Sequence, residues 1–417
     1  MKSSSGTPSI LVLAVAVTAA TLLSLPAWGS TRYRILHNFN SGEQYQIGPP
    51  GGPLLLDEQG NVYGGTGAGG VGCGGFGCGT IFELSPRADG HWRFTVLYEF
   101  LAGDDGESPW GALIFDQAGN LYGTTERDGG LGPSTAFELS PGPDGWTHTV
   151  LYDNGAGPGL LLDKAGNLYG SIGPGDYYSA GAIGELSPGE NGWTYTQLYS
   201  FCSQNDCADG MGPPSAPIWD AHGNLFGTTN SGGKGQEECL YGCGVVFEMT
   251  PKPDGSWRYH VLHRFDSSPD DGRAPGGGLV MDAEGNLYGE TRTGGHYGNG
   301  TIYEMSETGG RWKKTALYDF PDCFIGCNPF GTLVFDTAGN LYGAGNGGNP
   351  DCGNGCGVVF KLTRQKNGKW KYGTVHKFDG TDGYGPWGVI VDGKGNIFGT
   401  TENGWKYDWG VAYEITP

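Results

Sequence analysis

The chain contains 417 residues and carries a formal net charge of −20. Because such an acidic surface repels phosphate groups, we expect no nucleic-acid partner. Glycine accounts for 82 residues and proline for 25, while aromatic residues make up 12% of the chain. Disordered chains are poor in aromatic residues, so this composition favours a folded all-β protein with many tight turns.

The N-terminal segment has the features of a secretory signal. Lys2 precedes an apolar run at residues 10–25, and Ala27 and Gly29 place small residues where a signal peptidase cleaves. The run is shorter than the ~20 residues that cross a bilayer. We predict a signal peptide at residues 1–29 and no membrane span after its cleavage. The mature protein is then secreted, periplasmic or on the cell surface; an uncleaved N-terminal anchor is the alternative.

An internal repeat dominates the rest of the chain. The pattern Asp-x-x-Gly-Asn-x-aromatic-Gly occurs seven times, starting at Asp57, Asp116, Asp163, Asp220, Asp282, Asp336 and Asp392. Four short runs rich in aromatic and β-branched residues accompany the pattern, for example "GALIFD", "NLYGTT", "TIFELSP" and "RFTVLYEF". Four-stranded units in tandem are typical of propeller blades.

The repeated Asp has a structural interpretation. Its side chain can accept hydrogen bonds from backbone N–H groups two residues further on, and the following Gly can adopt a positive φ. We therefore interpret the seven Asp residues as hairpin turns between the first and second strands, and not as catalytic or calcium-binding positions.

The two ends of the chain complement each other. Residues 31–39, "TRYRILHNF", match the fourth strand of the unit but precede the first complete unit, whereas the last unit ends at "GVAYEITP" without a fourth strand. Sharing one blade between the ends would remove two open sheet edges. We predict that residues 30–417 form a single, monomeric, all-β seven-bladed β-propeller with four-stranded blades, in which residues 31–39 complete the blade of residues 387–417.

The units resemble a known repeat. "GNLYGTTERDGG", "GNLFGTTNSGG" and "VVFEMTP" are similar to the GloVer-type tandem repeat of secreted bacterial proteins, and the resemblance extends over residues 31–417. It implies export but no assigned activity, so no catalytic residue follows from it. Relatives often carry a C-terminal sorting or anchoring segment; this sequence ends directly after a strand, so we expect free secretion.

The ten cysteines fall into five close pairs: Cys73/Cys78, Cys202/Cys207, Cys239/Cys243, Cys323/Cys327 and Cys352/Cys356. In an oxidising compartment each pair is expected to form a disulfide within its own loop. The spacing and the lack of adjacent histidines argue against a zinc site, and we predict no metal site at the cysteines.

In a propeller, the loops between second and third strands and those between blades lie on one face, which we call the upper face. All five cysteine pairs fall there. Since variable loops on a rigid scaffold commonly bind ligands, we hypothesise that this face binds a glycan, a cell-wall polymer or a protein. The candidate ligand-binding residues are Trp110, His296, Tyr297, Phe330, Tyr384, Trp387, Asp104 and Asp271. Trp110 and Trp387, each in "PWG", could instead plug the central channel, and strand packing is favoured for Trp405, Tyr407 and Trp409.

Catalytic signatures are weak, and the catalytic residues are unknown. His37, His263 and His376 replace the Tyr of the fourth-strand pattern, which indicates structural roles. The sequence lacks a nucleophile elbow, a phosphate-binding loop and clustered histidine ligands, so we predict no cofactor. Calcium bound by acidic residues of the upper face stays open. The alternative function is a secreted lyase or hydrolase for a polysaccharide or cyclic peptide, with Asp104 and Asp271 converging on the axis.

Overall fold

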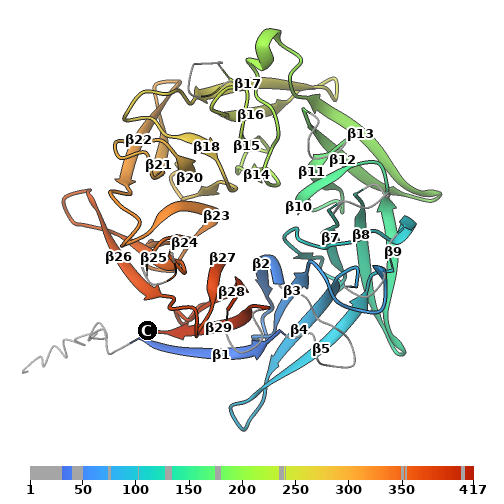
Figure 1. The fold of residues 1–417 in the computed structure, drawn as a ribbon. Coiled ribbons are helices and arrows are strands. Elements are labelled where there is room, and N and C mark those ends of the chain that lie inside the picture. Colours follow the sequence, from blue (N-terminus) through green and yellow to red (C-terminus); the bar gives the residue numbers. More distant parts are fainter. Residues whose placement is uncertain are drawn as a thin grey trace, which may run out of the picture.

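The computed structural model describes residues 31–39, 50–73, 77–101, 103–126, 134–173, 180–233, 239, 241–348, 352, 355–404 and 409–417. Their strands form seven antiparallel sheets around one axis, which confirms the seven-bladed propeller (Figure 1). We number the blades 1 to 7 in chain order. Each blade runs from an innermost strand at the axis to an outermost strand at the circumference.

Blade 1 contains β2 (Pro50–Leu56), β3 (Val62–Thr66), β4 (Thr80–Pro86) and β5 (Trp92–Glu99). Blade 2 contains β6 (Ile114–Phe115), β7 (Leu121–Thr124), β8 (Ala136–Gly142) and β9 (Gly145–Tyr152). Blade 3 contains β10 (Ala156–Leu162), β11 (Leu168–Ile172), β12 (Ala182–Gly189) and β13 (Gly192–Ser200). Short 3₁₀ turns at η2 (Gly103–Asp105) and η3 (Asn205–Cys207) lie between blades.

Blade 4 contains β14 (Ile218–Trp219), β15 (Leu225–Thr229), β16 (Val245–Pro251) and β17 (Trp257–Arg264). Blade 5 contains β18 (Arg273–Pro275), β19 (Val280–Met281), β20 (Leu287–Thr293), β21 (Thr301–Thr308) and β22 (Arg311–Asp319). Blade 6 contains β23 (Cys327–Phe335), β24 (Leu341–Asn346), β25 (Val358–Arg364) and β26 (Trp370–Lys377). Blade 7 contains β27 (Tyr384–Val391), β28 (Ile397–Asn403), β29 (Val411–Thr416) and β1 (Arg32–Asn38).

The two ends of the chain close the ring in blade 7. β1 pairs antiparallel with β29, from Arg32 opposite Thr416 to Asn38 opposite Val411. In Figure 1 the blue β1 therefore lies along the red β29. The predicted pairing of residues 31–39 with the last blade is confirmed, although the innermost strand of that blade already begins at Tyr384.

The seven Asp residues form the predicted hairpin turns. Asp57 Oδ1 accepts hydrogen bonds from the backbone N–H groups of Gln59 (2.9 Å) and Asn61 (2.8 Å), and Gly60 has φ +86°. Asp57 Oδ2 accepts a further bond from the side-chain amide of Asn61. The same three bonds recur in the other six turns. The Asp carboxylates are therefore occupied by the turn.

The glycine after the repeated aromatic residue permits close packing within the blade. A Cβ atom added to Gly123 would lie 2.6 Å from the ring of Phe137 and 2.7 Å from the side chain of Leu113. Both distances are too short for carbon atoms in contact. The repeat therefore needs glycine where the second strand passes over the aromatic side chain of the third strand.

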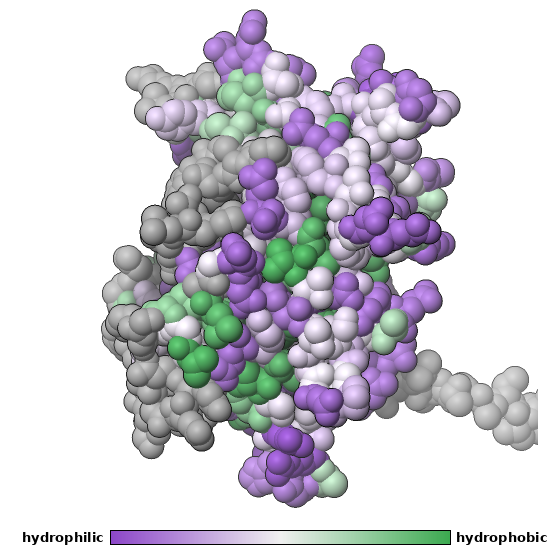
Figure 2. Space-filling model, turned by 90° about the vertical axis from the view of Figure 1, so that its right-hand side faces the viewer, coloured by the Kyte–Doolittle hydropathy of each residue, from purple (hydrophilic) through white to green (hydrophobic). Residues whose placement is uncertain are grey.

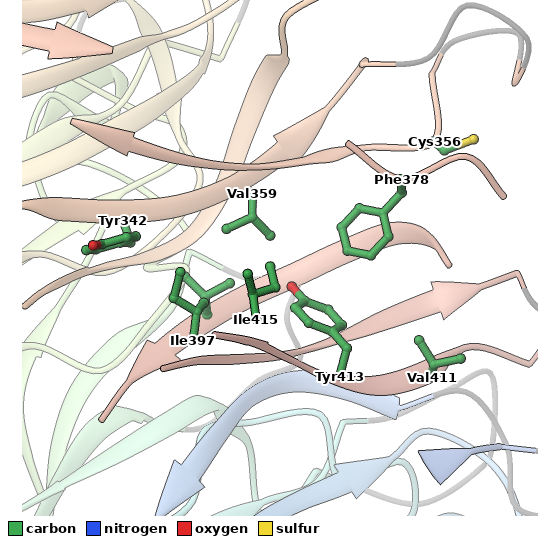
Figure 3. Close-up of a cluster of buried hydrophobic side chains, with 9 residues drawn as sticks. Tyr342, Cys356, Val359, Phe378, Ile397, Val411, Tyr413 and Ile415 are labelled. Atoms are coloured by element: carbon green, nitrogen blue, oxygen red, sulfur yellow. The ribbon is translucent and has the colours of Figure 1, made fainter. Parts of the chain in front are cut away.

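The hydrophobic core is distributed over the joints between blades. Figure 3 shows the cluster between blades 6 and 7, where Val359 and Phe378 of blade 6 pack against Ile397, Tyr413 and Ile415 of blade 7. These five side chains are at most 3% exposed. Because adjacent blades share each cluster, contacts between blades contribute to the apolar burial of every blade.

Stacked rings reinforce six of the seven joints near the outermost strands. Each pair joins a ring near the end of one fourth strand to a ring on the neighbouring blade, with centroids 3.9–4.8 Å apart: His37–Phe94, Tyr98–His148, Tyr152–Tyr195, Tyr199–Tyr259, Tyr318–Tyr372 and His376–Tyr33. His37 and His376 therefore have the structural role expected from the sequence. Burial lowers the pKa of His37 to about 4, so its ring packs as the neutral form at neutral pH.

The outer wall around β9 and β13 shows mainly polar side chains, with apolar ones visible between them (Figure 2). In the part of the chain that the structure describes, no helix has the length and apolar character needed to cross a membrane.

Candidate functional site

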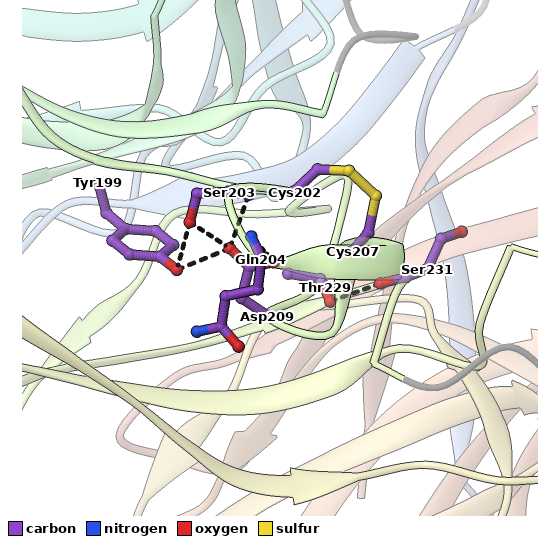
Figure 4. Close-up of a disulfide and its surroundings, with 8 residues drawn as sticks. All are labelled: Tyr199, Cys202, Ser203, Gln204, Cys207, Asp209, Thr229 and Ser231. Atoms are coloured by element: carbon purple, nitrogen blue, oxygen red, sulfur yellow. Dashed lines mark hydrogen bonds between the residues drawn. A yellow bond between two sulfur atoms is a disulfide. The ribbon is translucent and has the colours of Figure 1, made fainter.

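Five local disulfides brace the loops of the upper face, as predicted: Cys73–Cys78, Cys202–Cys207, Cys239–Cys243, Cys323–Cys327 and Cys352–Cys356. The loop closed by Cys202–Cys207 also holds buried Asp209, whose carboxylate accepts hydrogen bonds from Tyr199 (2.7 Å) and Ser203 (2.8 Å) (Figure 4). Asp209 therefore fixes this loop to the outermost strand of blade 3.

Three aromatic side chains meet at the upper end of the axis. The rings of Trp110 and Trp387 contact edge to face with centroids 5.5 Å apart, and Trp387 contacts Phe330 in the same way at 5.3 Å. We call Trp110, Phe330 and Trp387 the axial group. Phe330 and Trp387 belong to innermost strands of blades 6 and 7, and Trp110 leads into blade 2. All three are half-buried, so each retains an exposed part.

The prolines of "PWG" and "NPF" hold the axial group in place. A Cβ atom added to Gly79 would lie 2.5 Å from Cδ of Pro109, and one added to Gly357 would lie 2.1 Å from Cδ of Pro386. Pro329 of "NPF" lies likewise 2.7 Å from a Cβ atom added to Gly300, so each proline packs on a glycine of the preceding blade and fixes the backbone before the aromatic residue.

Trp110 can contact Trp387 because blade 1, which lies between their blades, has a glycine at the crossing point. A Cβ atom added to Gly67 would lie 1.9 Å from Trp110 Nε1, so the indole crosses blade 1 where that blade has no side chain. The Nε1 atoms of Trp110 and Trp387 are both buried without a hydrogen-bond partner among the described residues. Both indole N–H groups are therefore enclosed by protein atoms, while part of each ring remains exposed.

A buried acid lies at the joint between blades 5 and 6. Glu290 of β20 is 2% exposed, and neither of its carboxyl oxygens has a hydrogen-bond partner among the described residues. Burial raises the pKa of this carboxyl well above its usual range, against the smaller opposing effect of Arg292. Burial therefore favours the protonated, uncharged form of Glu290 over the carboxylate.

Three other blades have threonine at the position of Glu290, namely Thr124, Thr228 and Thr400. Thr228 donates a hydrogen bond to the carbonyl oxygen of Gly277 in the next blade (3.0 Å), and Thr124 accepts one from the N–H of Gly159 (3.3 Å). Glu290 stands in place of this threonine, and its carboxyl oxygens make no such hydrogen bond among the described residues. Alignment of the units reveals the substitution, "LYGE" in place of "LYGT", and we missed it because it changes one letter inside a strand.

Arg292 lies two residues after Glu290, at the upper rim, and its side chain is exposed. A Cβ atom added to Gly276 would lie 2.5 Å from Cγ of Arg292 and 3.8 Å from Cβ of Phe330. The arginine therefore crosses the innermost strand of blade 5 beside the axial group. No motif marks Arg292 in the sequence, but it is the only cationic residue among those that stand ten positions after the repeated Asp in the seven units.

The structure does not bring the two predicted axial carboxylates together. Asp271 accepts hydrogen bonds from His263 Nε2 (2.9 Å) and pairs with Lys314 (2.8 Å), so it fastens the outermost strands of blades 4 and 5. Asp104 lies exposed in η2, between blades 1 and 2. The hypothesis that these residues converge on the axis is wrong because Asp271 is buried between the outermost strands of blades 4 and 5. His263 has the structural role expected for it.

The other predicted site residues make their contacts outside the axial group. His296 and Tyr297 pack edge to face, and His296 lies 3.7 Å from the carboxylate of Asp270 in the loop between blades 4 and 5. Tyr384 packs against the cluster between blades 6 and 7. Trp409 packs at the joint between blades 7 and 1. Trp405 and Tyr407 lie outside the described residues.

Comparisons with known proteins agree with the repeat and the fold. A family model described as the Gloeobacter/Verrucomicrobia repeat matches residues 19–239 and 213–417. No curated protein matches the chain. An ancestral GH74 enzyme has a similar structure, with a TM-score of 0.56 and 12% identity; the match covers 88% of this chain and 48% of that enzyme. A putative 6-phosphogluconolactonase from Bacteroides uniformis gives a TM-score of 0.50 at 13% identity, with 87% and 88% covered. The chain thus spans about half the length of the GH74 enzyme, and at these identities the likeness concerns the fold alone.

Proposed function

The chain belongs to the Gloeobacter/Verrucomicrobia repeat family, and we propose that it is an exported binding module that recognises a glycan chain at the axial group. The observation that carries the proposal is the gathering of Trp110, Phe330 and Trp387 at one end of the axis, each half-buried. Aromatic rings with one exposed part offer sugar rings an apolar surface with little loss of conformational entropy.

The polar groups around the axial group suit a polyhydroxylated ligand. The rim position that follows the second strand carries Asn230 in blade 4 and Asn346 in blade 6, both half-buried. Amide side chains both donate and accept hydrogen bonds.

Export is part of the proposal. Five disulfides require an oxidising compartment to form and persist, and the first 29 residues carry the signal pattern described above. We expect the mature protein to act outside the cytoplasm. The enzymatic alternative requires Asp104 and Asp271 to converge on the axis, whereas the carboxylate of Asp271 is bound to His263 and Lys314.

Binding of the purified mature protein to a panel of soluble glycans and cell-wall polymers tests the proposal. We expect Phe330→Ala to weaken binding of a retained glycan about tenfold or more, as loss of a central aromatic contact does. Phe324→Ala is the matched control, since Phe324 is a 62% exposed aromatic residue in the loop before the same blade. Thermal unfolding of both variants shows whether the fold is retained. Binding that Phe330→Ala leaves unchanged, or no glycan binding at all, would refute the proposal.

A further inference from the structure

We propose that the ligand of the axial group is a polysaccharide that carries carboxylate groups, such as a polyuronate, and that Arg292 binds one of these carboxylates. The inference rests on the proposed function and specifies the ligand of the same site. Two features of the molecule support it: an exposed guanidinium group beside the axial group, and a buried acid below it.

Arg292 is held at the rim by its stem. Its Cγ and Cδ atoms lie 2.5 Å and 2.8 Å from the position of a Cβ atom added to Gly276, so a larger residue at Gly276 would displace the arginine. Phe330 adjoins the same position at 3.8 Å. A ligand ring on Phe330 therefore lies within reach of the guanidinium group, whose planar donors match a carboxylate bidentately.

The guanidinium group is not neutralised by the protein. Within the described part of the chain no carboxylate forms an ion pair with Arg292. Glu290, two residues earlier on the same side of β20, is buried, and its carboxyl oxygens have no hydrogen-bond partner among the described residues. In a chain of net charge −20, an unpaired exposed arginine beside an aromatic surface is a specific site for an anion.

The charges at the rim give the ligand an orientation. The positions equivalent to Arg292 hold Asn230 in blade 4 and Asn346 in blade 6, whereas blades 7 and 2 have Glu402 and Glu126 there. A ligand carboxylate is thus favoured over blades 4 to 6 and disfavoured over blades 7 and 2. The neutral part of the sugar then lies toward Trp387 and Trp110.

Calorimetry with an oligogalacturonate and its fully methyl-esterified form tests the inference, because the ester keeps the sugar rings and removes the charges. We expect the native protein to bind the acid at least tenfold more tightly than the ester, as a charge-assisted bidentate contact would give. Arg292→Gln should abolish the difference and leave ester binding unchanged. Glu290→Gln should leave both affinities unchanged, because Glu290 is 2% exposed and cannot contact a ligand.

The outcomes separate the inference from the proposed function. Equal binding of acid and ester by the native protein, or a preference that survives in Arg292→Gln, overturns the role of Arg292. Binding of a neutral glucan but neither oligogalacturonate overturns the carboxylated ligand and leaves the glycan-binding function in place. Binding only of an acidic peptide, with loss in Arg292→Gln, overturns both in favour of a protein partner. Thermal unfolding of each variant confirms that the fold is intact.

Discussion

The joint between blades 4 and 5 gives the sharpest test of how the ring is held together. There Lys314 replaces the aromatic ring found at the other six joints, and the buried Asp271 connects it to His263. Replacing Asp271 with Ala would remove the carboxylate and leave the ammonium group of Lys314 without its counter-charge. The Lys314 side chain is only 6% exposed, so water cannot readily solvate the charge.

The magnitude follows from this burial. Removing one partner of a buried ion pair costs about 3–5 kcal/mol. Lys314 Nζ keeps the backbone carbonyl oxygens of residues 270 (3.2 Å) and 271 (2.6 Å) as acceptors, so we expect the lower end, about 3 kcal/mol. With an unfolding entropy of ~2.1 cal/mol/K per residue, this lowers the thermal midpoint of the ring by about 4 °C.

A double substitution supplies the matched control. In the neighbouring joint, Tyr199 donates to the Asp209 carboxylate and Tyr259 to the Asp209 carbonyl oxygen while their rings stack. His263→Tyr with Lys314→Tyr would recreate this arrangement around Asp271. We expect the double variant to unfold within about 1 kcal/mol of the native protein, because stacked rings replace the ion pair.

The effect of Asp271→Ala should also depend on pH. Burial alone would raise the pKa of Asp271, but the hydrogen bond and charge of His263 and the ammonium group of Lys314 outweigh it and lower the pKa. The stabilisation is therefore complete above the unfolded pKa of ~3.9 and is lost as the pH falls through the folded value. Differential scanning calorimetry at pH 7 and pH 3 measures both effects. The reasoning would be contradicted if Asp271→Ala lowered the thermal midpoint by less than about 1 °C at pH 7, or if the double variant were as unstable as Asp271→Ala.

Three other predictions concern the ring and its loops. Deleting residues 30–40 should expose β29 as an open edge and cause aggregation, measured by size-exclusion chromatography; a monomeric product that unfolds cooperatively would argue against strand sharing. Gly123→Ala should destabilise the ring by about 1–3 kcal/mol through overpacking, whereas Gly373→Ala should not, because nothing lies within 4 Å of the added methyl group. Equal thermal unfolding midpoints of the two variants would show that the blade accommodates the methyl group at Gly123. Reduction of the disulfides should increase hydrogen exchange in the upper loops while the blade strands stay protected, and exchange throughout the strands would show that the disulfides hold the ring itself.

The sequence alone determined the features that repeat. Seven copies of the Asp-x-x-Gly-Asn pattern fixed the number of blades and the hairpin turns, because the Asp side chain bonds only to its own turn. The unmatched strand at residues 31–39 fixed how the ring closes. The disulfides were equally readable, since each pair lies at most 5 residues apart. All these contacts are local or are specified by counting units.

Only the tertiary structure decided which side chains meet across blades. Asp104 and Asp271 stand in similar upper loops, and nothing in their local sequence indicates that they serve different joints. Trp110 and Trp387 come together over Gly67 although blade 1 lies between their own blades. The burial of Glu290 and the proximity of Arg292 to Phe330 depend on how the innermost strands converge at the axis. Such contacts join residues tens to hundreds of positions apart, so no short pattern in the sequence encodes them.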